Sequence, residues 1–280
     1  MAMGDFRPPR RLIVNADDFG LSNSINEAVI RAHRDGILTS ASLMVNGDAV
    51  DAAVNLARAN PRLGVGLHLV LVFGRATLPA AHLPGLVDAS GHFSYQPVLT
   101  GLRYFLSSGL REPLRREIDA QFARFEATGL PLDHVNGHLN LHLHPTVFRL
   151  LLARAPRSPA IRKLRVTRDP FRLNAALAAG AWAYRVSHAL IFALLSAWVR
   201  PQLARRGIRH TRHVFGLLQN GRVDESFVLR LLSRLPAGDS ELYSHPSLNE
   251  FRPEFDALVS DRVRAAIRQT GVQLIRYQDL

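Results

Sequence analysis

Short apolar runs alternate with segments of helical periodicity along most of this 280-residue chain, and no other feature of the sequence limits its fold as much. Residues 12–14, 41–45 and 64–70 have the composition of buried strands, and residues 22–34 and 49–58 carry apolar side chains at helical spacing. Strands and helices that alternate in this way form a parallel sheet covered by helices. We therefore predict an α/β fold.

The same patterns continue to the C-terminus. Further helices are predicted at 110–128, from Pro145 onward, at 225–234 and at 255–269, and further strands at 134–138, 163–167, 241–244 and 272–275. The stretch 73–104 is rich in Gly, Pro and small residues, so we expect a long loop that shapes a binding cleft. With 47% hydrophobic residues the chain can bury one large core, and we expect a single domain over residues 1–280.

The composition limits the partners and the location. The formal charge is +12, from 35 Lys and Arg against 23 acidic residues, which is compatible with anionic lipid, nucleic acid or plain solubility. The basic residues are scattered and no RNA or DNA motif accompanies them, so we predict no nucleic-acid partner. The absence of cysteine excludes disulfides and thiolate chemistry, and the apolar run after residues 1–11 is too short for a secretory signal. We expect a cytoplasmic protein.

Four polar signatures each follow an apolar run. They are Asn15-Ala16-Asp17-Asp18, Gly66-Leu67-His68, Asn136-Gly137-His138 and Ser244-His245-Pro246. In folds of alternating strands and helices, reactive groups gather where the strands end, so residues distant in sequence converge on one mouth. The signatures thus predict an enzyme with one site built from carboxylates and imidazoles.

Adjacent carboxylates that leave a strand point in different directions, so one can hold a metal ion while the other handles a proton. The alternative for Asp17 and Asp18 is a turn and a helix cap. His68 lies between two leucines, where a buried imidazole needs a hydrogen bond or a metal, and such a lone histidine is more often structural.

Four histidines at positions 134, 138, 142 and 144 crowd into one stretch, and spacing alone leaves the metal ligand among them open. His142 and His144 precede Pro145, so they either line the cleft or flank the next helix. One carboxylate and two imidazoles leave a coordination position for water, which is typical of hydrolysis of an amide or ester. His245 is placed to protonate a leaving nitrogen, unless it is only a turn residue.

Taken together, these residues resemble the YdjC-like carbohydrate deacetylases over most of the chain. The resemblance rests on Leu12–Ser22, Gly36–Ser40, Val45–Gly47, Gly66–His68, Asp133–Pro145 and Ser244–Pro246. It implies a single-domain distorted (β/α) TIM-like barrel with an apolar helical insertion. It also implies that Asp17 is the catalytic base, that Asp18, His68 and His138 bind one divalent metal ion, and that His245 is an acid or a transition-state donor.

The third signature departs from the family pattern. Relatives often have Asp-Ser/Gly-His-x-His-x-His there, whereas this chain has Asn136 and Asn140, which carry no charge. If these positions orient ligands, metal affinity or the preferred ion will differ. Zn²⁺ suits the proposed ligands best, with Mg²⁺ or Mn²⁺ as alternatives. The residues predicted to bind substrate are Asn15, Asn46, His134, Asn136, Asn140, Trp182 and Trp198.

Residues 173–199 are strongly apolar but are interrupted by Arg185 and His188, which argues against a membrane-spanning helix. One interpretation is a core helix or helix pair. The other is a lid or hairpin that contacts the membrane, assisted by basic residues at 200, 205, 206 and 209 and by interfacial aromatic side chains.

Within the family, the apolar segment points toward the hopanoid-biosynthesis-associated members (HpnK). We therefore expect a metal-dependent N-deacetylase whose partner is an amino-sugar-bearing hopanoid lipid, such as N-acetylglucosaminyl bacteriohopanetetrol, with peripheral contact at the inner membrane. Two alternatives stay open at this stage. One is a soluble chitooligosaccharide deacetylase, and the other is a non-catalytic lipid-binding scaffold.

Overall fold

A single parallel sheet organises the protein, in a computed structural model that describes residues 8–157, 159–178, 180–219 and 221–280. Its strands are β1 (Arg10–Phe19), β2 (Ser40–Leu43), β3 (Gly64–Leu69), β4 (Val135–Gly137), β5 (His213–Phe215), β6 (Gly238–Ser244) and β7 (Gln273–Leu274). Their order is β4-β3-β2-β1-β6-β5, and β7 pairs with the beginning of β1. The predicted α/β class is confirmed.

An irregular segment at residues 162–168 connects the two edges of this sheet. The amide of Val135 donates to Lys163 at 3.1 Å, and the amide of Val214 donates to the carbonyl of Arg168 at 3.1 Å. β4 is therefore linked to β5 through this segment, and the sheet curls into a distorted TIM-like barrel, as the family resemblance implied. The strand predicted at 163–167 forms only isolated bridges with its neighbours.

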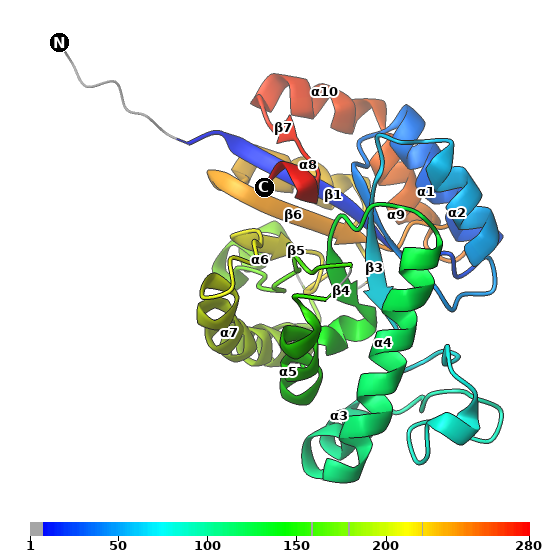
Figure 1. Ribbon diagram of the computed structural model, residues 1–280. Coiled ribbons are helices and arrows are strands. Elements are labelled where there is room, and N and C mark those ends of the chain that lie inside the picture. Colours follow the sequence, from blue (N-terminus) through cyan, green and yellow to red (C-terminus); the bar gives the residue numbers. More distant parts are fainter. Residues whose placement is uncertain (1–7, 158, 179, 220) are drawn as a thin grey trace.

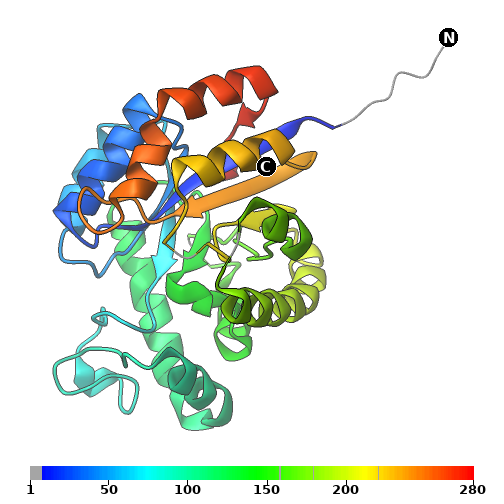
Figure 2. The same ribbon diagram turned by 180° about the vertical axis from the view of Figure 1, so that it is seen from behind.

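Helices surround the barrel. They are α1 (Asn23–Asp35), α2 (Val50–Arg58), α3 (Pro97–Leu106), α4 (Arg111–Ala127), α5 (Pro145–Arg154), α6 (Phe171–Leu177), α7 (Trp182–Ala204), α8 (Glu225–Arg234), α9 (Arg252–Val259) and α10 (Asp261–Thr270), with short 3₁₀ turns η1 (Ala80–His82), η2 (Ser108–Leu110), η3 (His138–Leu143) and η4 (Tyr277–Asp279). Figures 1 and 2 show α1, α2, α9 and α10 together on one side of β1 and β6, and α5, α6 and α7 on the other.

Local signals explain where several helices begin. Ser22 caps α1 by accepting a hydrogen bond from the amide of Ile25 at 3.3 Å, as the sequence predicted. Ser260 caps α10 in the same way and divides the helix predicted at 255–269 into two. The loop predicted at 73–104 was wrong at its end, because α3 begins at Pro97, in the first turn that proline tolerates.

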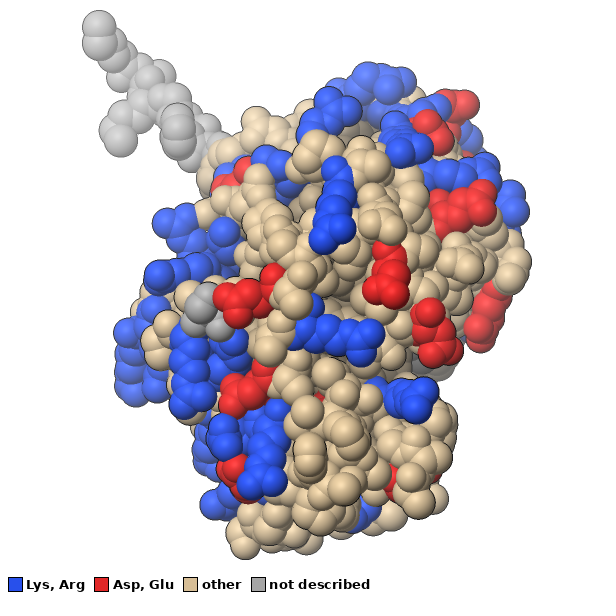
Figure 3. Space-filling view, turned by 45° about the vertical axis from the view of Figure 1, so that its right-hand side comes forward, with Lys and Arg blue, Asp and Glu red and all other residues tan. Residues whose placement is uncertain are grey.

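The side chains of α3 are mostly apolar yet face outward. Val98 is 86% exposed and Phe105 56% exposed. Together with residues 70–95, α3 forms the lowest part of the molecule in Figure 1, and the space-filling view shows that this lobe is largely uncharged, while Lys and Arg outnumber acidic residues on the rest of that face (Figure 3).

The apolar segment predicted at 173–199 forms α6 and α7. Ser196, Val199 and Leu203 anchor α7 to the barrel, but Leu190 is 61% exposed and Leu194 65% exposed. The interpretation of this segment as a core helix therefore does not describe α7. Among the described residues, α7 is the helix with sufficient length and apolar character to cross a membrane.

Candidate metal centre

The two adjacent aspartates at the end of β1 point to different partners. Asp18 has a φ of +62°, a left-handed conformation that is uncommon for a residue with a side chain. The backbone turns at this residue, so the carboxylate of Asp18 faces β3 and η3 while that of Asp17 faces the barrel interior. As predicted, the two adjacent carboxylates point in different directions.

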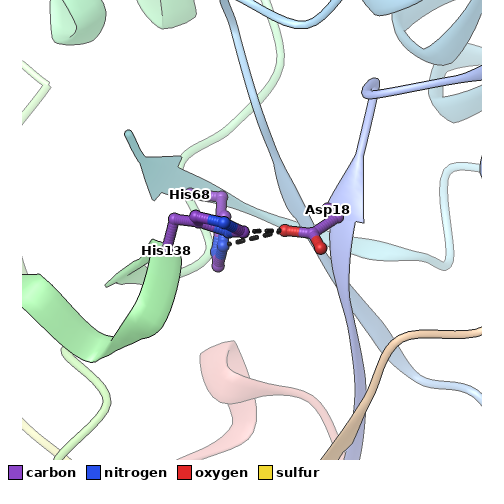
Figure 4. Close-up of side chains that lie close together, drawn as sticks. All are labelled: Asp18, His68 and His138. Atoms are coloured by element: carbon purple, nitrogen blue, oxygen red, sulfur yellow. Dashed lines mark hydrogen bonds and ion pairs between the residues drawn. The ribbon is translucent and has the colours of Figure 1, made fainter. Parts of the chain in front are cut away.

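Asp18 meets two imidazoles at the mouth of the barrel. Its Oδ1 lies 3.2 Å from Nε2 of His68 and 3.1 Å from Nδ1 of His138 (Figure 4). One potential ligand atom from each of the three residues lies within 4.8 Å of the other two. A single divalent ion could therefore be bound by all three at once.

The hydrogen bonding of His68 fits a metal ligand. Its Nδ1 lies 2.7 Å from Oδ1 of Asn136, an acceptor that fixes the proton on Nδ1 and leaves a lone pair on Nε2. That Nε2 atom is buried and has no hydrogen bond of good geometry among the described residues. A buried acceptor without a hydrogen bond destabilises the folded protein unless a ligand contacts that atom.

The charge of the carboxylate is also suitable. Burial tends to raise the pKa of Asp18, but the hydrogen bond from His138 and the electrostatic influence of the two imidazoles outweigh burial and hold the pKa well below its ordinary value. Asp18 is therefore ionised at neutral pH. A carboxylate with two imidazoles is a common ligand set for Zn²⁺.

Asp17 is held by an arginine inside the barrel. Arg165 donates to Oδ2 of Asp17 at 2.7 Å and to Oδ1 at 2.9 Å, and Asn15 donates to Oδ1 at 2.8 Å. Burial would raise the pKa of Asp17, but the charge of Arg165 and its hydrogen bonds lower the pKa well below the usual range. Asp17 is therefore an ionised acceptor beside the candidate metal ligands.

Arg165 itself lies between two carboxylates. Its Nε and Nη2 also donate to Glu241 at 2.9 and 2.6 Å, and Tyr277 donates to the other oxygen of Glu241. Arg165 and Glu241 are both fully buried. Sequence reasoning missed this network, although a charged residue within each of the predicted apolar strands 163–167 and 241–244 was a signal that could have revealed it.

His245 lies at the end of β6, on the same mouth. A cavity of about 160 Å³ is lined by Asp17, Asp18, Leu21 and His245, among others. The amide of His245 donates to the buried carboxylate of Glu254 at 2.6 Å, which fixes the turn before Pro246. The imidazole is half-buried and can reach a ligand in this cavity.

The neighbouring histidines of the third signature have supporting positions. The Nε2 of His142 lies 3.0 Å from the carbonyl of Arg165, and burial lowers the pKa of His142 to about 3, so it stays neutral. His144 caps α5 by accepting from the amide of Thr146 at 3.3 Å. Both residues are therefore outside the set that surrounds Asp18.

Three of the residues predicted to bind substrate lie beneath the site. Asn15, His134 and Asn136 are buried and all contact Ser42. His134 also stacks on Tyr277 with the ring centroids 4.1 Å apart. Gly66 allows this packing, because a Cβ there would lie 2.5 Å from the His134 ring. These three side chains form a buried layer around Ser42, in which Asn136 contacts His68 and Asn15 contacts Asp17.

The other predicted substrate residues lie farther from it. Asn140 accepts from Thr167 at 2.6 Å, and Asn46 lines the neighbouring cavity beyond Leu21. Trp182 and Trp198 are on α7, where Trp198 packs against Phe148 of α5. Contact of any of these residues with substrate stays a prediction.

The fold and the site define a class of protein: an α/β barrel that brings Asp18, His68 and His138 together where its parallel strands end. The sequence profile described as YdjC-like protein matches residues 11–269. The chain belongs to the YdjC-like family, as its resemblance indicated.

The relatives agree with this assignment. A carbohydrate deacetylase of Brevibacillus brevis is 42% identical over 142 residues, which cover 51% of this chain and 54% of the relative. A chitooligosaccharide deacetylase of Serratia marcescens is 30% identical over 279 residues, which cover 96% and 98%. The chain spans 54–64% of the length of the curated relatives that it matches at 37–42% identity.

A crystal structure from Enterococcus faecalis V583 has the same fold. It matches with a TM-score of 0.73 and 24% identity, and the match covers 97% of this chain and 98% of the other. At this identity the similarity concerns the fold alone.

Proposed function

We propose that the protein is a metal-dependent hydrolase that removes the acetyl group from an N-acetylated amino sugar. The observation that carries this proposal is the cluster of Asp18, His68 and His138, next to an ionised Asp17 that lines one cavity together with Asp18. The names of the relatives, carbohydrate deacetylase and chitooligosaccharide deacetylase, support the same reaction.

A divalent ion held by the three ligands would polarise the acetyl carbonyl and acidify water. Asp17 is ionised across the neutral range and lies next to Asp18, so it can accept the proton of the attacking water. Arg165 keeps that carboxylate in place. His245 lines the same cavity and can donate a proton to the nitrogen as the C–N bond breaks, which releases acetate and a free amine.

For the group that bears the sugar, we propose a hopanoid lipid, with N-acetylglucosaminyl bacteriohopanetetrol as the substrate. The exposed apolar side chains of α7 support this proposal, since a soluble sugar would not need them. Arg205, Arg206 and Arg209 are exposed just beyond α7 and would favour an anionic membrane surface. The protein would then act from the cytoplasm at the inner membrane.

A soluble chitooligosaccharide is the second candidate. The name of the Serratia marcescens relative favours it, as does the polar lining of the cavity next to the metal centre. In this case the reaction and its residues would be the same, and only the part of the substrate beyond the amino sugar would differ.

Mass spectrometry of both substrates tests the proposal. Purified protein is incubated with N-acetylglucosaminyl bacteriohopanetetrol or diacetylchitobiose, with and without a chelator, and loss of acetyl should lower the mass by about 42 Da. Asp18→Ala should abolish metal binding and activity, whereas Asp17→Asn should retain the metal and lose activity. Chelator-insensitive turnover would contradict the metal centre, and no turnover of either substrate would favour a non-catalytic scaffold.

A further inference from the structure

A short hairpin stands beside the metal centre within the long segment after β3. The amide of Phe93 donates to Gly74 at 2.8 Å, that of Ala76 to Gly91 at 2.8 Å, and that of Phe73 to Ser94 at 3.2 Å. Residues 73–76 and 91–94 are therefore paired, and this part of the segment has a defined backbone.

The hairpin presents an aromatic pair to solvent. The rings of Phe73 and Tyr95 meet edge to face with their centroids 5.4 Å apart, and the residues are 38% and 62% exposed. Phe73 has a φ of +51°, a strained conformation for an aromatic residue. A strained backbone that places an aromatic ring at the surface does not stabilise the hydrophobic core. A role in ligand binding therefore explains the conformation of Phe73 better.

A cavity of about 430 Å³ lies against this pair, and we call it the Tyr95 cavity. Its wall includes Leu21, Asn46, Arg75 and His92. Leu21 also lines the 160 Å³ cavity that holds Asp17, Asp18 and His245, so the two cavities adjoin. A saccharide bound at Asp18 can therefore extend past Leu21 into the Tyr95 cavity.

We propose that the Tyr95 cavity binds the pyranose ring joined to the reacting amino sugar of an oligosaccharide. The inference rests on the second candidate of the proposed function, a chitooligosaccharide, and it assumes that the reacting sugar lies at Asp18. Aromatic rings suit the apolar C–H face of a pyranose, and the hydroxyl groups need both donors and acceptors at the edge.

The remaining wall supplies both kinds of group. Arg75 offers a cation and Asp48 a carboxylate, and among the described residues neither has an ion-pair partner. The backbone carbonyl of Arg75 accepts a hydrogen bond from the Asn46 side chain, which ties the hairpin to the loop after β2. The α7 surface lies on the other side of the molecule (Figure 1) and takes no part in this inference.

To test whether the Tyr95 cavity binds the second sugar ring, saccharide binding and turnover are measured separately. Calorimetry on metal-free protein with N-acetylglucosamine and its β-1,4-linked dimer should give an affinity at least about 10-fold higher for the dimer. Tyr95→Ala should remove most of that ratio, and Tyr95→Phe, which keeps the ring, should retain it. The matched control is Phe105→Ala, at a similarly exposed aromatic residue of α3 outside the cavity, which should leave the ratio unchanged.

The outcomes separate the two proposals. Equal affinity of the wild-type protein for both sugars, or an unchanged ratio in a folded Tyr95→Ala variant, would overturn the role of the cavity. Acetate release is then assayed with the metal-loaded protein. Length-dependent binding without acetate release would overturn the deacetylase and leave the cavity as a saccharide site, whereas acetate release without length dependence would overturn only the cavity.

Discussion

Replacement of Arg165 by methionine should destabilise the protein in a pH-dependent way. The guanidinium is fully buried and donates to Asp17 at 2.7 and 2.9 Å and to Glu241 at 2.6 and 2.9 Å. Methionine fills a similar volume but leaves two buried carboxylates without their cation. Removal of one partner from a buried ionic group costs about 3–5 kcal/mol of folding free energy.

The pH dependence follows from the pKa of Asp17. In the wild type this pKa is lowered, so the stabilisation is present above the unfolded value of about 3.9 and is lost as the pH falls toward the folded value. Without Arg165, burial raises the pKa instead, and the variant loses stability as the pH rises above about 4. The difference in free energy of unfolding between the wild type and the variant should therefore grow with pH. It should grow by about 1.4 kcal/mol per pH unit for each carboxyl that stays protonated in the folded variant.

Urea unfolding at pH 5 and pH 7.5 in the presence of a chelator measures this gap without interference from a metal. The control is Arg154→Met, another buried arginine, which contacts the partly exposed Asp119 at 3.7 Å. The Arg154→Met variant should lose less free energy of unfolding than Arg165→Met, and this loss should be nearly independent of pH. A gap for Arg165→Met that is the same at both pH values would refute the reasoning, because it would mean that neither carboxylate depends on the arginine for its charge.

Other expectations concern the metal ligand, a second buried carboxyl and α7. Asn136→Ala should weaken Zn²⁺ binding 10- to 100-fold in a chelator competition, because it removes the acceptor that orients His68, whereas Asn140→Ala should have little effect. Burial raises the pKa of Asp169 to about 7, so thermal unfolding should show stability falling as the pH rises from about 4 to 7, by about 4 kcal/mol, and Asp169→Asn should flatten the profile. Leu194→Ser should reduce co-sedimentation with phosphatidylglycerol vesicles about 10-fold, and unchanged binding would contradict membrane contact through α7.

Most of the barrel was predictable because its strands and helices carry clear periodicity. Helix α8 has the bounds that the sequence predicted, and Ser22 was identified as the cap of α1. The segments that close the barrel were not predictable in the same way. Strand β5 has only three residues, and residues 162–168 bond to β4 and β5 without forming a regular strand, so the length and alternation that signal a strand are missing.

The signatures predicted one site of carboxylates and imidazoles where the strands end, and the family resemblance supplied Asp18, His68 and His138 as the candidate ligands. The conformation that joins them was not visible in the sequence. Asp18 faces the two histidines because its backbone is left-handed, and the geometry favours His138 among the crowded histidines as the candidate ligand: His138 begins η3 at the mouth, while His134 stacks on Tyr277. Spacing does not contain this information.

The departure at position 136 also has a physical explanation that only the neighbours reveal. Asn136 accepts from His68 through its oxygen and donates through its nitrogen to Asp17 at 3.2 Å and Ser42 at 2.7 Å. An aspartate could accept from His68, but it would oppose the carboxylate of Asp17 and could not donate to it. The amide thus couples the metal ligand to the proposed base. It orients both with one side chain and leaves Arg165 as the cation that balances Asp17.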